Sequence, residues 1–161
     1  MIELTVNGRR RSVHPRARET LLEILRREFC TMGVREACGI GMCGACTVLA
    51  EGRTISSCLV LAGLADGAVV ETVESLAGPD GRLSDLQQAF VDHTAFQCSY
   101  CTPGFLLASR ALLEENPDPT DDQIRHGLAG NLCRCGSCLK IIDAVQDAAS
   151  RARAKAAPGG A

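Results

Sequence analysis

Aromatic residues are scarce in this chain of 161 residues, which has no tryptophan, one tyrosine and four phenylalanines. Hydrophobic residues nevertheless make up 46% of it, which is enough for a packed core. That core must be built from leucine, isoleucine, valine and alanine, together with whatever the ten cysteines bind. The length suits one ordinary domain or two small ones.

The chain also lacks an excess of charge of either sign. Its 17 lysines and arginines are balanced by 19 aspartates and glutamates, for a net charge of −2. Proteins that bind nucleic acids through phosphate contacts normally carry a basic excess or stripe, so we expect no nucleic-acid partner. So small a net charge gives little repulsion between molecules, which suits a subunit that stays docked to others.

Segments that would direct the chain to or across a membrane are not seen in the sequence. No apolar run reaches the length of a membrane span, and Met1–Val6 has no cationic start followed by apolar residues. Arg9–Arg11 precede polar residues rather than the apolar region of a twin-arginine signal. We therefore expect a soluble, cytoplasmic protein. In that compartment ten cysteines indicate metal binding rather than disulfides.

The first half of the sequence has the two-residue period of strands, interrupted by one helix. Residues 2–6 alternate apolar and polar, and Asn7–Gly8 predicts a hairpin turn into a second strand that ends near His14. Thr20 and Glu23 form a capping box, which predicts a helix directly after Thr20. Further strands are predicted at 47–49, 54–55 and 68–73.

The second half has the 3.6-residue period of helices. Residues 77–81, Ala-Gly-Pro-Asp-Gly, break all regular structure and form the predicted domain boundary. Four helices are predicted after it, at about 83–90, 103–115, 120–129 and 137–153. The sequence thus predicts an α+β protein with a mixed-sheet domain at 1–76, a four-helix domain at 82–154 and a disordered tail at 155–161.

Four cysteines of the first half have the spacing C-x4-C-x2-C, with the fourth cysteine further on, which is typical of plant-type [2Fe–2S] proteins. This first quartet consists of Cys38, Cys43, Cys46 and Cys58. Glycines at 39, 41 and 44 lie among them, and a loop with few side chains lets backbone N–H groups approach an anionic cluster. A structural zinc site is the alternative, although zinc prefers two C-x2-C pairs and only one is present.

The segment Gly39–Gly44 also matches the dinucleotide-binding pattern G-x-G-x-x-G. That motif requires a preceding parallel strand and a helix that opens from it. The sequence predicts neither at this place. We therefore reject a nucleotide site and assign these glycines to the cysteine loop.

The second half contains a C-x2-C pair and, about thirty residues later, a C-x-C pair. This second quartet consists of Cys98, Cys101, Cys133 and Cys135. Thr102 and Pro103 are interpreted as the N-cap and the first residue of a helix, and the C-x-C pair falls just before the last helix. Helix N-termini stabilise anions, so a second cluster fits there. A zinc site or scattered core cysteines are the alternatives.

Together, these motifs resemble the iron–sulfur small subunit of the molybdenum hydroxylases, the xanthine oxidase and aldehyde oxidoreductase family. As a separate chain, the protein is similar to the small subunits of carbon monoxide dehydrogenase and 4-hydroxybenzoyl-CoA reductase. The resemblance extends from Ile2 to about Ala149, and its motifs occur in the family's order. The four motifs are Gly39–Val48, Ser57–Leu59, Gln97–Gly104 and Asn131–Cys135.

The resemblance implies a β-grasp, ferredoxin-like domain followed by a four-helix bundle, each with its own [2Fe–2S] cluster. It also implies an electron-transfer subunit in a three-subunit enzyme, assembled as a dimer of heterotrimers, whose catalytic site lies on another subunit. Electrons would pass from molybdopterin, as its cytosine dinucleotide, on a large subunit through both clusters to FAD on a medium subunit. The resemblance places Gln97 and Cys135 against the pterin.

The sequence departs from the family pattern directly after Cys135, where Gly136–Cys138 replaces the usual Thr-Gly-Tyr. Cys138 could compete as an iron ligand, but its helical spacing to the apolar stripe that begins at Ile141 favours a buried thiol. Cys30, at the end of the first predicted helix, is likewise interpreted as a packing residue. The departure leaves the pterin contact and the substrate subgroup open.

Two other functions stay open at this stage: a free-standing two-cluster ferredoxin and a zinc-stabilised interaction module. The substrate of the whole enzyme is also open among carbon monoxide, an aldehyde, an N-heterocycle and an aryl-CoA thioester. His14, His93 and His126 lie outside the cysteine motifs, so we expect no Rieske-type site. Arg151–Lys155 is interpreted as a solvated helix face.

Overall fold

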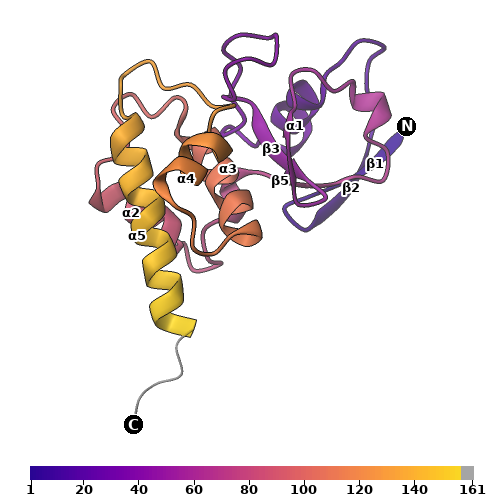
Figure 1. Ribbon diagram of the computed structural model, residues 1–161. Coiled ribbons are helices and arrows are strands. Elements are labelled where there is room, and N and C mark those ends of the chain that lie inside the picture. Colours follow the sequence, from indigo (N-terminus) through magenta and orange to yellow (C-terminus); the bar gives the residue numbers. More distant parts are fainter. Residues whose placement is uncertain (157–161) are drawn as a thin grey trace.

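The computed structural model describes residues 1–156, in which five strands and one α-helix precede four further α-helices (Figure 1). The strands are β1 (Ile2–Val6), β2 (Arg9–Val13), β3 (Thr47–Ala50), β4 (Arg53–Ser56) and β5 (Val69–Glu71). The helices are α1 (Leu21–Phe29), α2 (Asp85–Asp92), α3 (Thr102–Glu115), α4 (Asp121–Gly127) and α5 (Cys138–Ala156), with short 3-10 helices η1 (Ala62–Leu64) and η2 (Val73–Ser75). The predicted α+β class is confirmed.

The strands form one mixed sheet in the order β2-β1-β5-β3-β4. β1 pairs antiparallel with β2 and parallel with β5, whereas β3 pairs antiparallel with both β4 and β5. Both hairpins turn on two residues of positive φ, Asn7–Gly8 (49° and 76°) and Glu51–Gly52 (49° and 74°). Such turns match the right-handed twist of the strands they join, which is why the sequence pattern predicts them.

Helix α1 lies against this sheet and closes the first core. Thr20 accepts a hydrogen bond from the Glu23 backbone N–H, and the Glu23 side chain accepts one from Thr20, so the predicted capping box is confirmed. The apolar side of α1 is buried with residues of β1, β3 and β5 in an aliphatic cluster. This core is therefore built from aliphatic residues without tryptophan, as the composition predicts.

The helices of the second part begin and end where the sequence predicts, to within a few residues. Ser84 and Thr120 form capping boxes with Gln87 and Gln123 at the starts of α2 and α4. Helix α3 differs, since its N-cap is Cys101 and Thr102 is already its first helical residue. Pro103 is thus one position deeper than expected, where its missing N–H is still one that the helix leaves unpaired.

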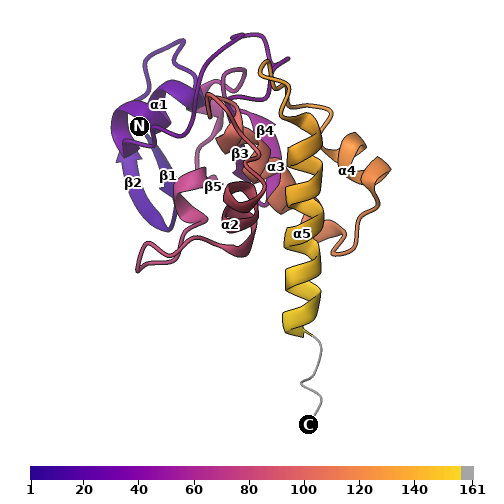
Figure 2. The same cartoon turned by 90° about the vertical axis from the view of Figure 1, so that its left-hand side faces the viewer.

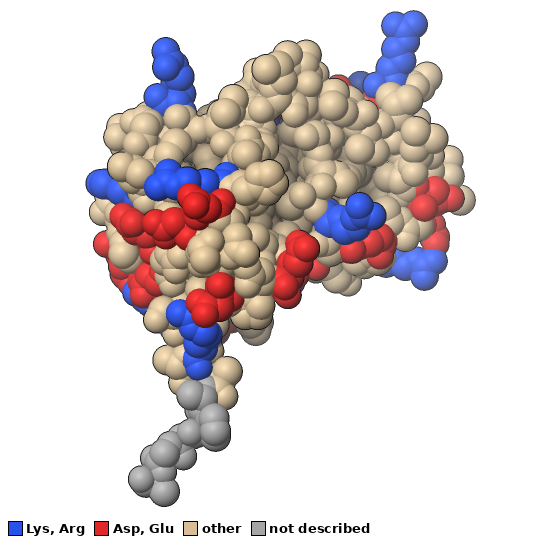
Figure 3. Space-filling model, viewed as in Figure 1, with Lys and Arg blue, Asp and Glu red and all other residues tan. Residues whose placement is uncertain are grey.

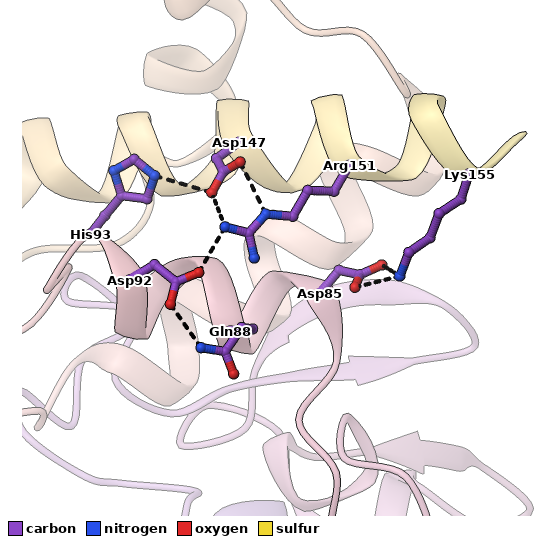
Figure 4. A network of polar contacts seen from close by, with 7 residues as sticks. All are labelled: Asp85, Gln88, Asp92, His93, Asp147, Arg151 and Lys155. Carbon is purple, nitrogen blue, oxygen red and sulfur yellow. Dashed lines mark hydrogen bonds and ion pairs between the residues drawn. The ribbon is translucent and has the colours of Figure 1, made fainter. Parts of the chain in front are cut away.

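Helix α5 is the longest helix and runs along the outside of the second part (Figure 2). Its buried face shares an aliphatic core with α2, α3 and α4. Arg151 pairs with Asp147 on α5 and with Asp92 on α2, and Lys155 pairs with Asp85 at 2.7 Å (Figure 4). Arg153 and Lys155 are exposed, in keeping with the interpretation of Arg151–Lys155 as a solvated helix face, and the ion pairs add contacts from this face to α2.

The structure differs from the predicted domain limits at two places. Helix α5 continues through Lys155 and Ala156, the first two residues of the expected tail; the rest of that tail, 157–161, lies outside the described residues. Val73 and Leu76 pack against the core of the helical part although the sequence assigned them to the sheet domain. The domain limits themselves stay a prediction.

The two parts meet at a contact so close that only glycine fits. A Cβ atom on Gly104 would lie 2.2 Å from the carbonyl oxygen of Gly44, and one on Gly44 would lie 2.5 Å from that of Gly130. Asn131 secures this contact by donating from Nδ2 to the Gly44 carbonyl oxygen at 3.0 Å. The loop of the first quartet and the loop of the second are thereby packed backbone to backbone.

Candidate metal centres

The first quartet lies on a loop between α1 and β3 and on the turn after β4. Three glycines of this loop have positive φ: Gly39, Gly41 and Gly44. The loop follows α1 and leads into β3, so the strand before it and the helix after it that a nucleotide motif requires are absent here, as predicted. β4 pairs with β3 so that Ser56 lies opposite Thr47, which brings the turn that holds Cys58 back beside the loop. The Ser57 hydroxyl donates to the Cys46 carbonyl oxygen at 2.7 Å.

The sulfurs of the first quartet lie in two pairs with different surroundings. Cys46 and Cys58 form the inner pair, with their sulfurs 3.3 Å apart, and burial raises the pKa of Cys58 to about 11. Cys38 and Cys43 form the outer pair. Backbone N–H groups, that of Ile40 foremost, together with the Cys43 thiol lower the pKa of Cys38 to about 6. The loop thus directs N–H donors at sulfur, as an anionic cluster requires.

The second quartet lies at the starts of two helices, as the sequence predicts. Cys101 is the N-cap of α3 with Cys98 three residues before it, and Cys133 and Cys135 lie in the turn before α5. The sulfurs of Cys98 and Cys135 are 3.4 Å apart.

Cys101 and Cys133 form the deeper pair. Burial, and then the neighbouring Cys133, raises the pKa of Cys101 to about 12. The pKa of Cys133 is lowered, although burial alone would raise it. The lowering comes from the backbone N–H groups of Ser137 and Cys135, and also from the Cys101 thiol and the Ser137 hydroxyl.

This arrangement in pairs fits a two-iron cluster. Each iron of a [2Fe–2S] centre is held by two thiolates, so two pairs of cysteines supply one complete set of ligands. A structural zinc ion instead needs four ligands around one point. Among residues 1–156, no three or more Cys, His, Asp or Glu side chains are arranged around a single ion position.

Cysteines of both quartets line one hollow of about 490 Å³. They are Cys43 of the first quartet and Cys98, Cys101 and Cys133 of the second, and Cys138 lies beside them. The backbone joins them as well, because the Leu132 N–H donates to the Cys43 carbonyl oxygen at 3.0 Å. One hydrogen bond therefore connects a residue of the first quartet to the residue that precedes Cys133.

The two cysteines outside the quartets are not in the core, and both interpretations as packing residues are wrong. Cys30 is exposed because it ends α1 in a left-handed conformation (φ 56°), which turns its side chain off the buried face. Cys138 is exposed at the first residue of α5, where it lines the same hollow as Cys98, Cys101 and Cys133. Ser137, directly before it, takes the buried position at 3% exposure.

Gln97 and the loops around the quartets are accessible. Gln97 is exposed and donates from Nε2 to the Cys135 carbonyl oxygen at 3.2 Å. Ile40 and Met42, beside the first quartet, are 62% and 66% exposed. In Figure 3 charges of both signs are interspersed over the lower part of the visible face, whereas the upper edge is uncharged between two protruding basic side chains.

Two residues that matter at these sites were not singled out by sequence reasoning. Asn131 bridges the two loops, and besides Gly44 its amide reaches the Thr47 hydroxyl at 3.4 Å. Ser137 lies beside Cys133 and its N–H donates to the Cys133 sulfur at 3.4 Å. A polar residue two positions from a cysteine of the quartet is the only signal for either, and it does not tell which partner the side chain meets.

No described helix combines the length and the apolar composition that crossing a bilayer demands.

Two family models match the chain in sequence order. A "2Fe-2S iron-sulfur cluster binding domain" matches residues 4–75, and a "[2Fe-2S] binding domain" matches residues 72–146. Together they cover both quartets.

Several characterised proteins are similar over nearly the full length. The nicotine 6-hydroxylase small subunit of Paenarthrobacter nicotinovorans is 49% identical over 91% of this chain and 88% of its own. The nicotinate dehydrogenase small FeS subunit of Eubacterium barkeri is 46% identical over 93% and 95%. A solved chain of quinoline 2-oxidoreductase from Pseudomonas putida 86 is 41% identical over 95% of both chains, with a TM-score of 0.88. The aldehyde oxidoreductase of Desulfovibrio desulfuricans is 38% identical with a TM-score of 0.87, over 96% of this chain and 17% of that one.

Proposed function

Because this chain belongs to the iron–sulfur small subunits of the molybdenum hydroxylase family, we propose that it carries electrons from molybdopterin on a large subunit to FAD on a medium subunit. The observation that carries the proposal is the closeness of the two quartets: Cys43 of the first lines the same hollow as three cysteines of the second, and the Leu132 N–H donates to the Cys43 carbonyl oxygen. A chain that only bound two metals for stability would not need them adjacent.

We assign Cys38, Cys43, Cys46 and Cys58 to one [2Fe–2S] cluster and Cys98, Cys101, Cys133 and Cys135 to the other. The paired sulfurs and the N–H groups directed at them support this assignment. When bound, each cluster supplies a one-electron carrier. The polypeptide holds the thiolates in place and stabilises their negative charge with backbone N–H groups.

We further propose that the second quartet faces the pterin and the first faces the flavin. Gln97 and Cys135 are the proposed pterin contacts, and their mutual hydrogen bond and accessibility support a shared surface. The exposed Ile40 and Met42 beside the first quartet support an apolar contact with another subunit. A dimer of heterotrimers and the cytosine dinucleotide form of the pterin belong to the same proposal.

The substrate class that the relatives favour is an N-heterocycle. The relatives named for nicotine, nicotinate and quinoline share that chemistry and are at least 41% identical to this chain. We propose that the enzyme served by this subunit hydroxylates such a ring, with the reaction itself on the large subunit. We also propose a cytoplasmic location, because thiol ligands that must stay reduced suit a reducing compartment.

The test is purification of the protein from its native source under anaerobic conditions. We expect it to co-purify with a molybdenum-containing and an FAD-containing chain, and to hold about four irons and four sulfides per small subunit. Isolation as a single chain that still carries both clusters would favour a free-standing ferredoxin. Stoichiometric zinc in place of iron would contradict both.

A further inference from the structure

Three side-chain hydroxyls are buried and have no hydrogen-bond partner among residues 1–156. They belong to Thr102, Ser109 and Ser137. Leaving a buried hydroxyl unpaired costs free energy, so each such atom requires an explanation, and a bound group next to it is one explanation. Of these three residues, Ser137 is the one whose backbone N–H donates to a sulfur of the quartets, that of Cys133.

Ser137 holds the N-cap position of α5, because its carbonyl oxygen accepts the Ile141 N–H at 3.0 Å. A serine there normally uses its hydroxyl to accept an N–H of the first helical turn. Thr20, Ser84 and Thr120 all do this at the starts of their helices. Among these four residues, Ser137 alone has a side-chain hydroxyl that accepts no N–H of its helix.

The Ser137 side chain is 3% exposed and therefore has no access to bulk water. Its hydroxyl lies close enough to the Cys133 sulfur to contribute to that thiol's environment, yet it forms no hydrogen bond of normal geometry with it. The hydroxyl therefore has a proton to donate next to Cys133. A cluster bound by the second quartet would supply sulfur acceptors bonded to the same iron as Cys133.

We propose that the Ser137 hydroxyl donates a hydrogen bond to a sulfur of the second cluster and thereby raises the reduction potential of that cluster. Reduction adds negative charge, and a donor on sulfur stabilises the more negative state. The inference rests on the proposed function, because it needs the second quartet to hold a cluster. It adds a residue that tunes the electron carrier without binding iron.

The test is a redox titration of the whole purified protein. The second cluster is monitored through its EPR signal, which is the signal that Cys101→Ser should remove. In Ser137→Ala we expect the ratio of reduced to oxidised second cluster, at a fixed potential near the midpoint, to fall about tenfold. That change corresponds to about 59 mV for a one-electron couple. The first cluster should titrate as in the wild type. Ser137→Thr keeps a hydroxyl and should keep the wild-type potential.

Ser109→Ala is the matched control, because it also removes a buried, unpaired hydroxyl but in the middle of α3. It should leave both potentials unchanged. Ser137→Gly removes the same hydroxyl with a residue that helix N-caps tolerate, so it decides the question if the alanine variant does not assemble. The Fe–S stretching bands should shift in D₂O for the wild type and less so for the alanine and glycine variants.

Wild-type potentials in the hydroxyl-free variants, with iron content intact, would overturn the inference and leave the proposed function standing. A Ser137→Thr variant that follows the alanine variant would also overturn it, since size rather than the hydroxyl would then set the potential. A wild-type protein without iron in the second quartet would instead refute the proposed function itself.

Discussion

The two cysteine sites meet the same chemical requirement with different backbone structures. The first quartet lies within 38–58 on a glycine loop and the turn after a neighbouring strand, and its N–H donors come from loop residues such as Ile40. The second quartet spans 98–135 and uses the starts of α3 and α5, where N–H groups are unpaired by construction. A loop gains such donors through positive φ at glycine, whereas a helix start provides them with ordinary residues.

This difference predicts different dependence on the rest of the fold. The first site is formed by residues close in sequence and by one hairpin. The second requires α3 and α5 to be packed against each other before its cysteines meet. Ligation of a cluster in the second quartet should therefore stabilise the helical part more than ligation in the first stabilises the sheet.

The largest effect should come from removing one ligand at each site. Cys43→Ser should abolish one EPR signal and about half of the iron, and Cys101→Ser should abolish the other, because each cluster needs all four thiolates. Iron analysis and EPR of the purified variants measure this. We expect the Cys101 variant to lose more thermal stability than the Cys43 variant. Loss of both signals from a folded single variant would contradict independent sites.

The next effect concerns the junction that ties the two sites together. Gly104→Ala should destabilise the protein by about 1–3 kcal/mol, because the new methyl would lie 2.2 Å from the Gly44 carbonyl oxygen. Helix propensity alone would favour alanine, so the loss isolates the contact. Gly130→Ala is the matched control, since nothing lies within 4 Å of its added Cβ. Urea unfolding followed by circular dichroism checks both, and equal midpoints would refute the close junction.

Much of the fold follows from local sequence signals. The Asn7–Gly8 turn and the Thr20 capping box depend on neighbouring residues only, and both are confirmed. The fold class and family rest on motifs whose spacing reflects cluster geometry. The turn and the capping box succeed as signals because each encodes a contact between residues that are near in sequence.

The errors arose where the outcome depends on how a helix end is placed in three dimensions. The helical stripe assigned Cys138 to the core, but periodicity does not reveal that α5 begins there and extends past the core. The same holds for Cys30, whose left-handed conformation no periodicity predicts. The partners of Arg151 on other elements could not be read from sequence either. The assignment of the eight cysteines as iron ligands stays a prediction.

A smaller effect is the difference in thiol reactivity between the cysteines of the quartets and the other two cysteines. In the iron-loaded protein, iodoacetamide should modify Cys30 and Cys138 and spare the other eight, because only these two are exposed and outside the quartets. Mass spectrometry of peptides counts the adducts. Cys138→Ala should leave both EPR signals intact. Protection of Cys138 together with loss of a signal in the alanine variant would assign it to the second cluster instead.

The smallest effect concerns the ion pairs that hold α2 against α5. Arg151 lowers the pKa of Asp92 and of Asp147, and His93 lies 3.1 Å from Asp147 (Figure 4). Because these carboxyl pKa values are lower in the folded protein, the two carboxylates add to the free energy of unfolding above the ordinary aspartate pKa. This added stability is lost as the pH falls through the lowered values. Arg151→Gln should therefore reduce the urea midpoint slightly at pH 7, as expected for partly exposed pairs.

The pH dependence distinguishes this electrostatic effect from a packing defect. The difference between Arg151→Gln and wild type should persist from pH 7 to pH 5 and shrink below the ordinary aspartate pKa, because there the wild type loses the same attraction. Arg125→Gln, on the exposed side of α4, is the control and should match the wild type throughout. Circular dichroism at each pH gives the midpoints. A difference that stayed constant into acid would mean that Arg151 acts through the packing of its stem along α5, and not through charge.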